Sequence, residues 1–133
     1  MIKIKDKPDS SKDIKELLHP FVREWFFKKF KDFSLPQLYS ILEVHSRNNI
    51  LVSAPTGSGK TLSSMLAILN ELIDSSERGV LEDRIYCIYV NPLKALSNDI
   101  TINLKIPLKE IEEIAGKDFG IRIGVRTGDT TQA

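Results

Sequence analysis

A glycine-rich stretch near the middle of the chain contains residue types that bind phosphate. Residues 54–61 (APTGSGKT) match the Walker A pattern, except that alanine replaces glycine at the first position. Gly57 and Gly59 can turn backbone N–H groups inward at angles that side chains disfavour, and Lys60 can place a cation beside the β and γ phosphates. The Thr61 hydroxyl can complete a Mg²⁺ shell, and the following helix N-terminus adds partial positive charge. The predicted nucleotide-binding residues are Thr56, Gly57, Ser58, Gly59, Lys60 and Thr61.

The elements predicted around this loop belong to an α/β fold. A short apolar strand, residues 50–52, precedes the loop, and an amphipathic helix follows it with apolar residues on one side from 62 to 73. Residues 84–90 are rich in β-branched and aromatic side chains, which predicts a buried strand with Cys87 in the core. Residues 121–126 predict a third strand. Because a strand, helix, strand unit implies parallel pairing, we expect a three-layer α/β fold with an incomplete parallel sheet.

Helices are predicted before and after this unit. Ser10 and Asp13 form a capping signal, and Pro20 divides the apolar pattern that follows into two short helices. Aromatic and lysine residues alternate over 25–33, a mixture that can stack on bases while neutralising phosphate. An amphipathic helix that packs its aromatic side chains on the core is the favoured interpretation. Further helices are predicted over 38–45, 93–105 and 108–115, with a break near Pro107 and a stop at Gly116.

Length and composition are those of one ordinary globular domain. The chain has 133 residues, 41% of them hydrophobic, and its 19 Lys+Arg against 18 Asp+Glu give a net charge of +1. No global field would draw it to nucleic acid or an acidic membrane, so any such contact must be local. The single cysteine excludes an intramolecular disulfide, and no apolar run resembles a signal peptide or membrane span. We therefore expect a cytoplasmic protein with a flexible leader over residues 1–12.

A second short motif, Ser34-Leu35-Pro36-Gln37, precedes the loop by about one helix. Ser34 and Gln37 have the spacing of a capping box, in which the glutamine side chain caps the helix that it begins. The same amide could instead pair with the donor and acceptor edges of an adenine. Both interpretations are open from the residues alone.

Several motifs together resemble those of superfamily 2 helicases of the DEAD/DEAH type. Residues 54–61 resemble motif I, residues 34–37 the Q motif, residues 91–99 motif Ia, and residues 124–130 the Thr-Gly-Asp motif. The nearest likeness is to the Lhr-like (large helicase-related) branch, in the leader LHPxVREWF, in PLKAL and in PLKE. This resemblance runs from about Leu17 to Gln132. Without it, the last two motifs would be an ordinary proline-started helix and a turn.

The resemblance implies ATP with Mg²⁺ as cofactors and Gln37 as the residue that recognises adenine. An aromatic residue before the glutamine often stacks on adenine in this family, and Phe30 is the candidate here, with Phe26, Phe27 and Phe33 as rivals. The family also holds a nucleic-acid backbone, DNA or RNA, at the other two motifs. The corresponding residues here are Pro92, Lys94, Ala95, Thr127, Gly128 and Asp129.

The sequence lacks parts that the resemblance leads one to expect. It has no Asp-Glu dipeptide for the acidic motif that holds Mg²⁺ and orients water, no Ser-Ala-Thr motif, and no second motor domain. Residues 13–133 therefore resemble the front portion of a RecA-like helicase ATP-binding domain that works with the remaining helicase domains, and we expect no ATP hydrolysis and no catalytic residue in this chain. The alternatives are another P-loop NTPase or kinase, or a non-catalytic module that binds ATP or nucleic acid.

Overall fold

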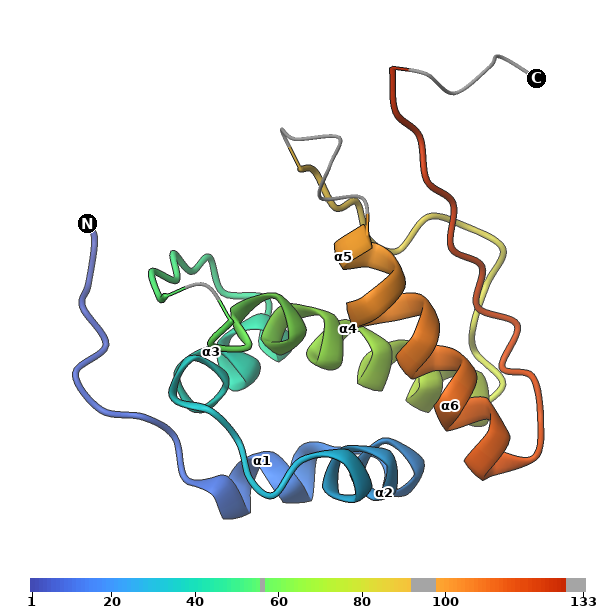
Figure 1. Ribbon diagram of the computed structural model, residues 1–133, viewed down its shortest axis with the longest axis horizontal. Helices are drawn as coiled ribbons and strands as arrows, with labels where there is room; N and C mark the ends of the chain where they lie inside the picture. Colours follow the sequence, from blue (N-terminus) through green and yellow to red (C-terminus); the bar gives the residue numbers. More distant parts are fainter. Residues whose placement is uncertain (56, 92–97, 129–133) are drawn as a thin grey trace.

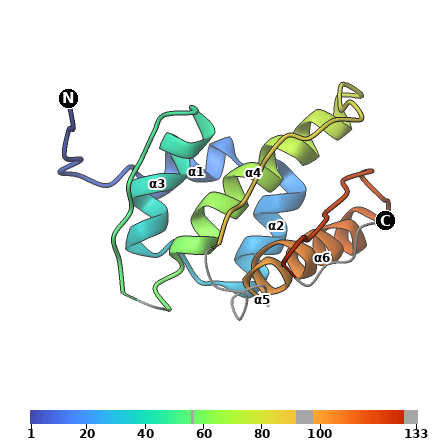
Figure 2. The same ribbon diagram turned by 90° about the horizontal axis from the view of Figure 1, so that it is seen from above.

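The computed structural model describes residues 1–55, 57–91 and 98–128, and these residues form helices joined by irregular chain (Figure 1). Helix α4 lies at the centre, with α3 on one side and the segment from α5 to α6 on the other (Figures 1 and 2). The helical elements are α1 (Ser11–Leu17), α2 (Pro20–Lys29), α3 (Leu35–His45), α4 (Lys60–Glu77), α5 (Asn98–Ile100), the π-helix η2 (Thr101–Lys105) and α6 (Ile106–Ala115).

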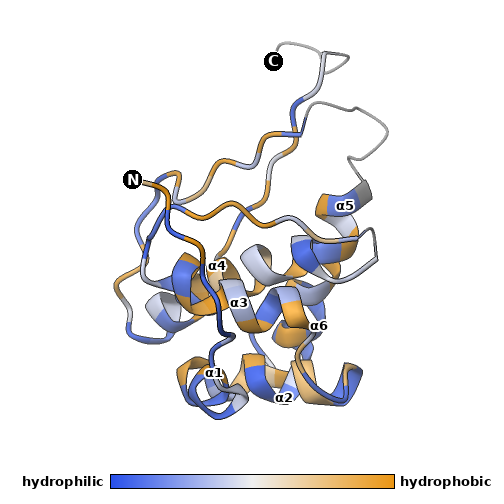
Figure 3. Cartoon of the chain, turned by 90° about the vertical axis from the view of Figure 1, so that its left-hand side faces the viewer, coloured by the Kyte–Doolittle hydropathy of each residue, from blue (hydrophilic) through white to orange (hydrophobic). Residues whose placement is uncertain are grey.

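The predicted α/β fold with a parallel sheet is wrong. Over the described ranges there is no strand, and the segments predicted as strands, 50–52, 84–90 and 121–126, are irregular. A strand is stabilised by ladder hydrogen bonds to a neighbouring strand, so an apolar run without such a partner stays unpaired and open to solvent. Leu51, in the middle of the first of these segments, is 96% exposed as a result. Cys87 is also exposed, not buried in a core as expected. Figure 3 shows hydrophobic stretches along this irregular chain as well as on the helices.

The two N-terminal helices begin where their capping residues predict. The Ser10 hydroxyl accepts a hydrogen bond from the Asp13 backbone N–H (3.1 Å) at the start of α1. At the start of α2, His19 Nδ1 accepts one from the Phe21 N–H (3.2 Å), and Pro20 occupies the first turn, where a missing N–H costs nothing. The prediction that Pro20 separates two short helices is confirmed.

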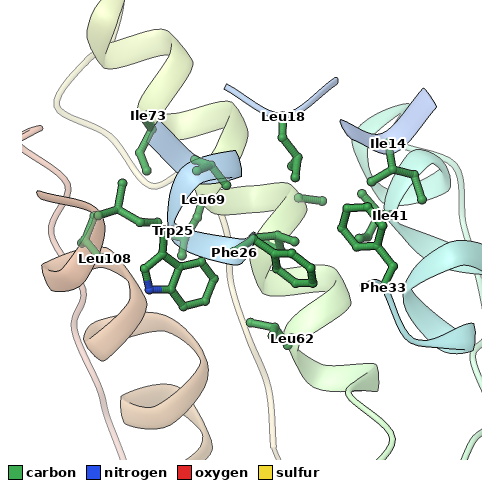
Figure 4. Packing of buried hydrophobic residues seen from close by; sticks show 14 of the residues in the cluster. Ile14, Leu18, Trp25, Phe26, Phe33, Ile41, Leu62, Leu69, Ile73 and Leu108 are labelled. Carbon is green, nitrogen blue, oxygen red and sulfur yellow. The ribbon is translucent and has the colours of Figure 1, made fainter. Parts of the chain in front are cut away.

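The core is built on the apolar face of α4. Side chains from α2, α3 and α6 pack on this face, with the ring of Phe26 stacked on that of Phe33 at a centroid distance of 4.7 Å (Figure 4). The prediction that the aromatic side chains of residues 25–33 pack on the core is confirmed for Trp25, Phe26 and Phe33, which are buried, but the helix itself ends at Lys29. The main residues of this cluster are Ile14, Leu18, Trp25, Phe26, Phe33, Ile41, Leu62, Leu69, Ile73, Leu108 and Ile111.

The break expected near Pro107 is instead one wide helical turn. The π-helix η2 runs directly into α6, and the Ile106 N–H donates to the Thr101 carbonyl, a span of one residue more than in an α-helix. Pro107 then falls in the first turn of α6, where its ring is tolerated.

Gly116 ends α6 at φ +70°, and its N–H donates to the Glu112 carbonyl (2.8 Å), so the predicted stop is confirmed. The helix predicted over 93–105 begins outside the described residues, which resume at Asn98, and its described part, 98–105, is helical as α5 and η2.

Candidate nucleotide-binding site

The glycine-rich loop is closed by a tight turn just before α4. The backbone N–H of Ser58 donates to the Pro55 carbonyl (3.2 Å), and the Ser58 hydroxyl donates to the same oxygen (2.5 Å). Gly57 and Gly59 have φ values of +81° and +83°, in the left-handed region that glycine adopts without steric cost. Both glycines thus adopt the positive φ angles that the pattern predicts. Thr56 lies outside the described residues.

Lys60 is the first residue of α4, and its side chain reaches back across the loop. Its ammonium donates to the Ala54 carbonyl (2.9 Å) and the side chain is otherwise exposed. The cation is therefore held beside the loop and beside the helix N-terminus, whose unpaired N–H groups carry partial positive charge. An anion bound there can take the place of the Ala54 oxygen as acceptor.

Gln37 connects α3 to this loop. Its carbonyl oxygen accepts a hydrogen bond from the Ser34 backbone N–H (2.9 Å), so the capping contact predicted from the spacing is confirmed. Its amide nitrogen lies against the loop, since a Cβ atom built on Gly59 would be 2.9 Å from this nitrogen and 3.2 Å from the Ser34 hydroxyl. Only 4% of Gln37 is exposed. One side chain thus caps α3 and packs on the phosphate-binding candidate loop.

Small serines allow α3 and α4 to approach each other at this point. Ser40 and Ser63 are buried, and each satisfies its hydroxyl within its own helix, Ser40 on the Pro36 carbonyl and Ser63 on the Lys60 carbonyl, both at 2.5 Å. The sequence interpretation missed both residues. Their position could have been found, because each follows a candidate site residue, Gln37 or Lys60, by one helical turn and so shares its face.

A cavity of about 270 Å³ lies beside the loop. Lys60 and the half-buried Thr61 line it, so the predicted phosphate and metal ligands face one space. Tyr89 also lines it and was missed, because it was assigned to a buried strand. The other lining residues are Ser40, Val44, Ile50, Val52, Ser63 and Ser64.

The aromatic candidates for adenine stacking differ in how accessible they are. Phe26 and Phe33 belong to the core and could not stack on a base without unfolding. Phe27 is half-buried with the Lys15 ammonium 4.7 Å from its ring centroid. Phe30, which follows α2 directly, is 37% exposed and contacts the rings of its neighbours on α2, including Phe26 at 4.9 Å. It remains the most accessible of the four rings.

The residues predicted to touch nucleic acid are only partly described. Thr127 and Gly128 line a second, larger cavity of about 1,150 Å³ between α4, η2 and the irregular segments 81–91 and 120–128. The Asp83 carboxylate and Arg122 guanidinium form an ion pair between those two segments. The predicted contacts Pro92, Lys94, Ala95 and Asp129 lie outside the described residues.

The part of the chain that the structure describes shows neither a membrane-spanning helix nor a metal-binding cluster of acidic, histidine and cysteine residues. None of its helices combines the length and the apolar character that crossing a bilayer demands. No group of three or more His, Cys, Asp or Glu side chains is placed to hold a metal ion.

Sequence comparison identifies the family of the chain. It belongs to the DEAD/DEAH box helicase family, whose sequence profile matches residues 34–132, a range that holds every candidate site residue except the aromatic candidates for adenine stacking. Among its relatives is the ATP-dependent helicase Lhr-Core of Methanothermobacter thermautotrophicus, which is 52% identical over 134 residues, 98% of this chain and 16% of the relative. Lhr-Core of Methanocaldococcus jannaschii is 53% identical over 96% of this chain and 16% of its own length.

A more distant relative is the Lhr helicase/uracil glycosylase of Escherichia coli, 36% identical over 94% of this chain and 9% of the relative. The resemblance to the Lhr-like branch is confirmed by these matches. The chain spans less than a fifth of the length of each of these three relatives. No solved structure matches the chain.

Proposed function

We propose that this chain binds ATP with Mg²⁺ at residues 54–61 and forms the nucleotide-binding front of an Lhr-type ATP-dependent helicase. The proximity of Gln37 to Gly59 carries the proposal, because the amide proposed to recognise adenine lies against a loop whose two glycines have positive φ angles. Lys60 and Thr61, which share one cavity beside that loop, are the proposed phosphate and metal ligands.

Each residue has a distinct task in this proposal. The N–H groups of the loop and of the first turn of α4 would hold the phosphates, and Lys60 would neutralise the β and γ oxygens once it leaves the Ala54 carbonyl. The Thr61 hydroxyl would hold Mg²⁺, which would supply positive charge to neutralise the phosphates. Gln37 would keep its cap on Ser34 through the carbonyl oxygen and offer its amide N–H groups to the base.

We also propose that this chain contacts a DNA or RNA backbone, through Pro92, Lys94, Ala95, Thr127, Gly128 and Asp129.

The groups that hydrolyse ATP are proposed to lie outside this chain. Hydrolysis needs a carboxylate that activates water and a cation that stabilises the transferred phosphoryl group, and the sequence has no Asp-Glu motif for the first task. The relatives are several times longer, so further domains are the proposed source of these groups.

Titration of the 133-residue chain with a fluorescent ATP analogue and Mg²⁺ tests the proposal. Lys60→Ala should weaken binding about tenfold or more, since a charge-assisted hydrogen bond is worth roughly 1.5–3 kcal/mol. Lys109→Ala on the exposed side of α6 removes the same charge away from the loop and is the matched control. Equal affinity of wild type and Lys60→Ala would contradict the site.

The same preparations test the expected lack of hydrolysis. Phosphate release by the wild-type chain should be no faster than by Lys60→Ala. Turnover by the wild type that Lys60→Ala abolishes would show that the chain activates water by itself. A contaminating ATPase would survive the substitution.

A further inference from the structure

One lysine of the N-terminal leader, Lys5, forms hydrogen bonds to α3. The Lys5 ammonium donates to the Asp9 carboxylate (2.6 Å), to the Tyr39 backbone carbonyl (3.0 Å) and to the Glu43 carboxylate (3.0 Å). There is one oxygen for each N–H of the ammonium, so its donor capacity is filled. The leader descends beside α3 on its way to α1 (Figure 1). Lys5 is half-buried in this position, unlike Lys3 and Lys7 on either side of it, which are exposed.

These contacts fall on the residues that directly follow Gln37. The Asp9 backbone N–H donates to the Leu38 carbonyl (3.0 Å), and Lys5 donates to the carbonyl of Tyr39. A carbonyl inside a helix keeps a second lone pair after its helical hydrogen bond, so both contacts add to the helix without breaking it. The leader is therefore hydrogen-bonded to α3 at the two residues that follow Gln37.

The charges of Asp9 and Glu43 shift the pKa of the lysine that they contact. Partial burial alone would lower the pKa of Lys5, but the hydrogen bonds and negative charges of Asp9 and Glu43 outweigh it, so the pKa lies above its usual value. The pKa of Glu43 is lowered by its hydrogen bond from the Asn48 amide and by Lys5. Through Asn48 (2.8 Å), the same carboxylate holds the turn from which the chain leads into the glycine-rich loop.

We infer that Lys5 is a positioning residue that holds α3 through Tyr39 and Glu43, just beyond its first turn, so that Gln37 stays packed on Gly59. If Gln37 recognises adenine, as proposed above, the leader supports that recognition; this consequence rests on the proposed nucleotide site. The glutamine amide lies close enough to Gly59 that a Cβ atom there would be 2.9 Å from its nitrogen, so its place relative to the loop depends on the position of α3. Lys5 touches neither the loop nor a nucleotide and acts only through α3.

The test uses the 133-residue chain in ¹⁵N-labelled form without nucleotide. Lys5→Ala should shift the resonances of the Gln37 side-chain amide and the Gly59 backbone amide, while Lys3→Ala, the control in the same leader, should leave both in place. Lys5→Arg keeps the charge and the donors and should restore most of the wild-type positions. Resonances of α6, such as that of Ile111, should not move, whereas general destabilisation would affect them too.

Nucleotide titrations then separate this inference from the proposed function. Lys5→Ala should lower ATP affinity roughly three- to tenfold and leave GTP affinity unchanged. A wild type that binds ATP and GTP equally would contradict adenine recognition, and the amide resonances would still decide the role of Lys5. Unmoved Gln37 and Gly59 resonances in Lys5→Ala would overturn the inference whatever the nucleotide data show. Glu43→Gln, which removes one partner of Lys5, replaces Lys5→Ala if that variant does not fold.

Discussion

The amide nitrogen of Gln37 lies so close to Gly59 that a Cβ atom on this glycine would be only 2.9 Å away from it. Gly59 is therefore constrained twice, by its positive φ of +83° and by the side chain of α3 that packs on it. Gly57 shares the first constraint, at φ +81°, but a Cβ atom there would meet nothing within 4 Å. The two glycines of one loop thus differ in what an added methyl group would meet.

Gly59→Ala should destabilise the chain more than Gly57→Ala. Both alanines would carry the cost of a left-handed backbone angle, about 1 kcal/mol, but only Gly59→Ala must also displace Gln37, which raises its expected cost to about 2–3 kcal/mol. Urea unfolding followed by circular dichroism measures the free energies of unfolding. Equal losses for the two variants would mean that Gln37 moves aside without cost.

Gln37→Glu should separate the capping role of this residue from base recognition. The glutamate keeps an oxygen that can accept from the Ser34 N–H, but because Gln37 is only 4% exposed, burying the new carboxylate should cost about 1–3 kcal/mol of unfolding free energy. It loses the amide donors, so the preference for ATP over GTP should disappear. The ratio of the two affinities is the readout, because the added charge weakens both nucleotides alike. An unchanged ratio would favour capping as the only role of Gln37.

Phe26 and Phe30 should give opposite results on stability and binding. Phe26 is fully buried among Trp25, Phe27 and Phe33, so Phe26→Ala should cost about 3–5 kcal/mol of unfolding free energy. Phe30 is more than a third exposed, so Phe30→Ala should cost about 1 kcal/mol but weaken binding of ATP. Thermal melts with and without ATP measure both effects. Wild-type ATP affinity in Phe30→Ala would remove this ring from the proposed site.

The contacts of Glu43 with Asn48 and Lys5, and those of Lys5 with Asp9 and Glu43, should make stability depend on pH at both ends of the range. The lowered pKa of Glu43 adds stability above its unfolded value of about 4.3, and this stability is lost as the pH falls through the folded pKa. The raised pKa of Lys5 adds stability that is complete below about pH 10.4 and is lost as the pH rises through the folded pKa.

Glu43→Gln should therefore show a smaller loss of melting temperature between pH 7 and pH 3 than wild type. Glu16→Gln is the control, since Glu16 is exposed and its Lys12 partner is 4.0 Å away. A wild-type acid dependence in Glu43→Gln would mean that the ion pair adds no measurable stability.

The exposed apolar side chains of residues 84–90 should cause the chain to self-associate. Ile85 and Ile88 are 79% and 78% exposed, and a net charge of +1 gives little repulsion between copies. Replacing both with lysine should raise the concentration at which light scattering detects association. Ser46→Lys with Asn49→Lys adds the same charge at exposed polar positions and should have a smaller effect. A wild type that stays monomeric at all concentrations would contradict this expectation.

The helices and turns were predictable because their signals are local. The Ser10 cap, the separation at Pro20, the two positive-φ glycines of the loop and the stop at Gly116 each depend on a residue and its nearest neighbours in sequence. The amphipathic pattern of α4 likewise identifies the face that packs on the core. The motifs that resemble those of the DEAD/DEAH helicases were recognisable for the same reason, since each is a short contiguous run of residues.

Tertiary structure alone decided the features that depend on partners distant in sequence. The apolar runs 50–52, 84–90 and 121–126 have strand composition, but a strand forms only where another backbone pairs with it, and composition does not contain that partner. In the same way, the packing of α3 on α4 and not the spacing of Ser34 and Gln37 places the glutamine amide on Gly59. The hold of Lys5 on Tyr39 and Glu43 joins residues more than thirty positions apart, because only folding brings an ammonium in the leader to oxygens on a helix.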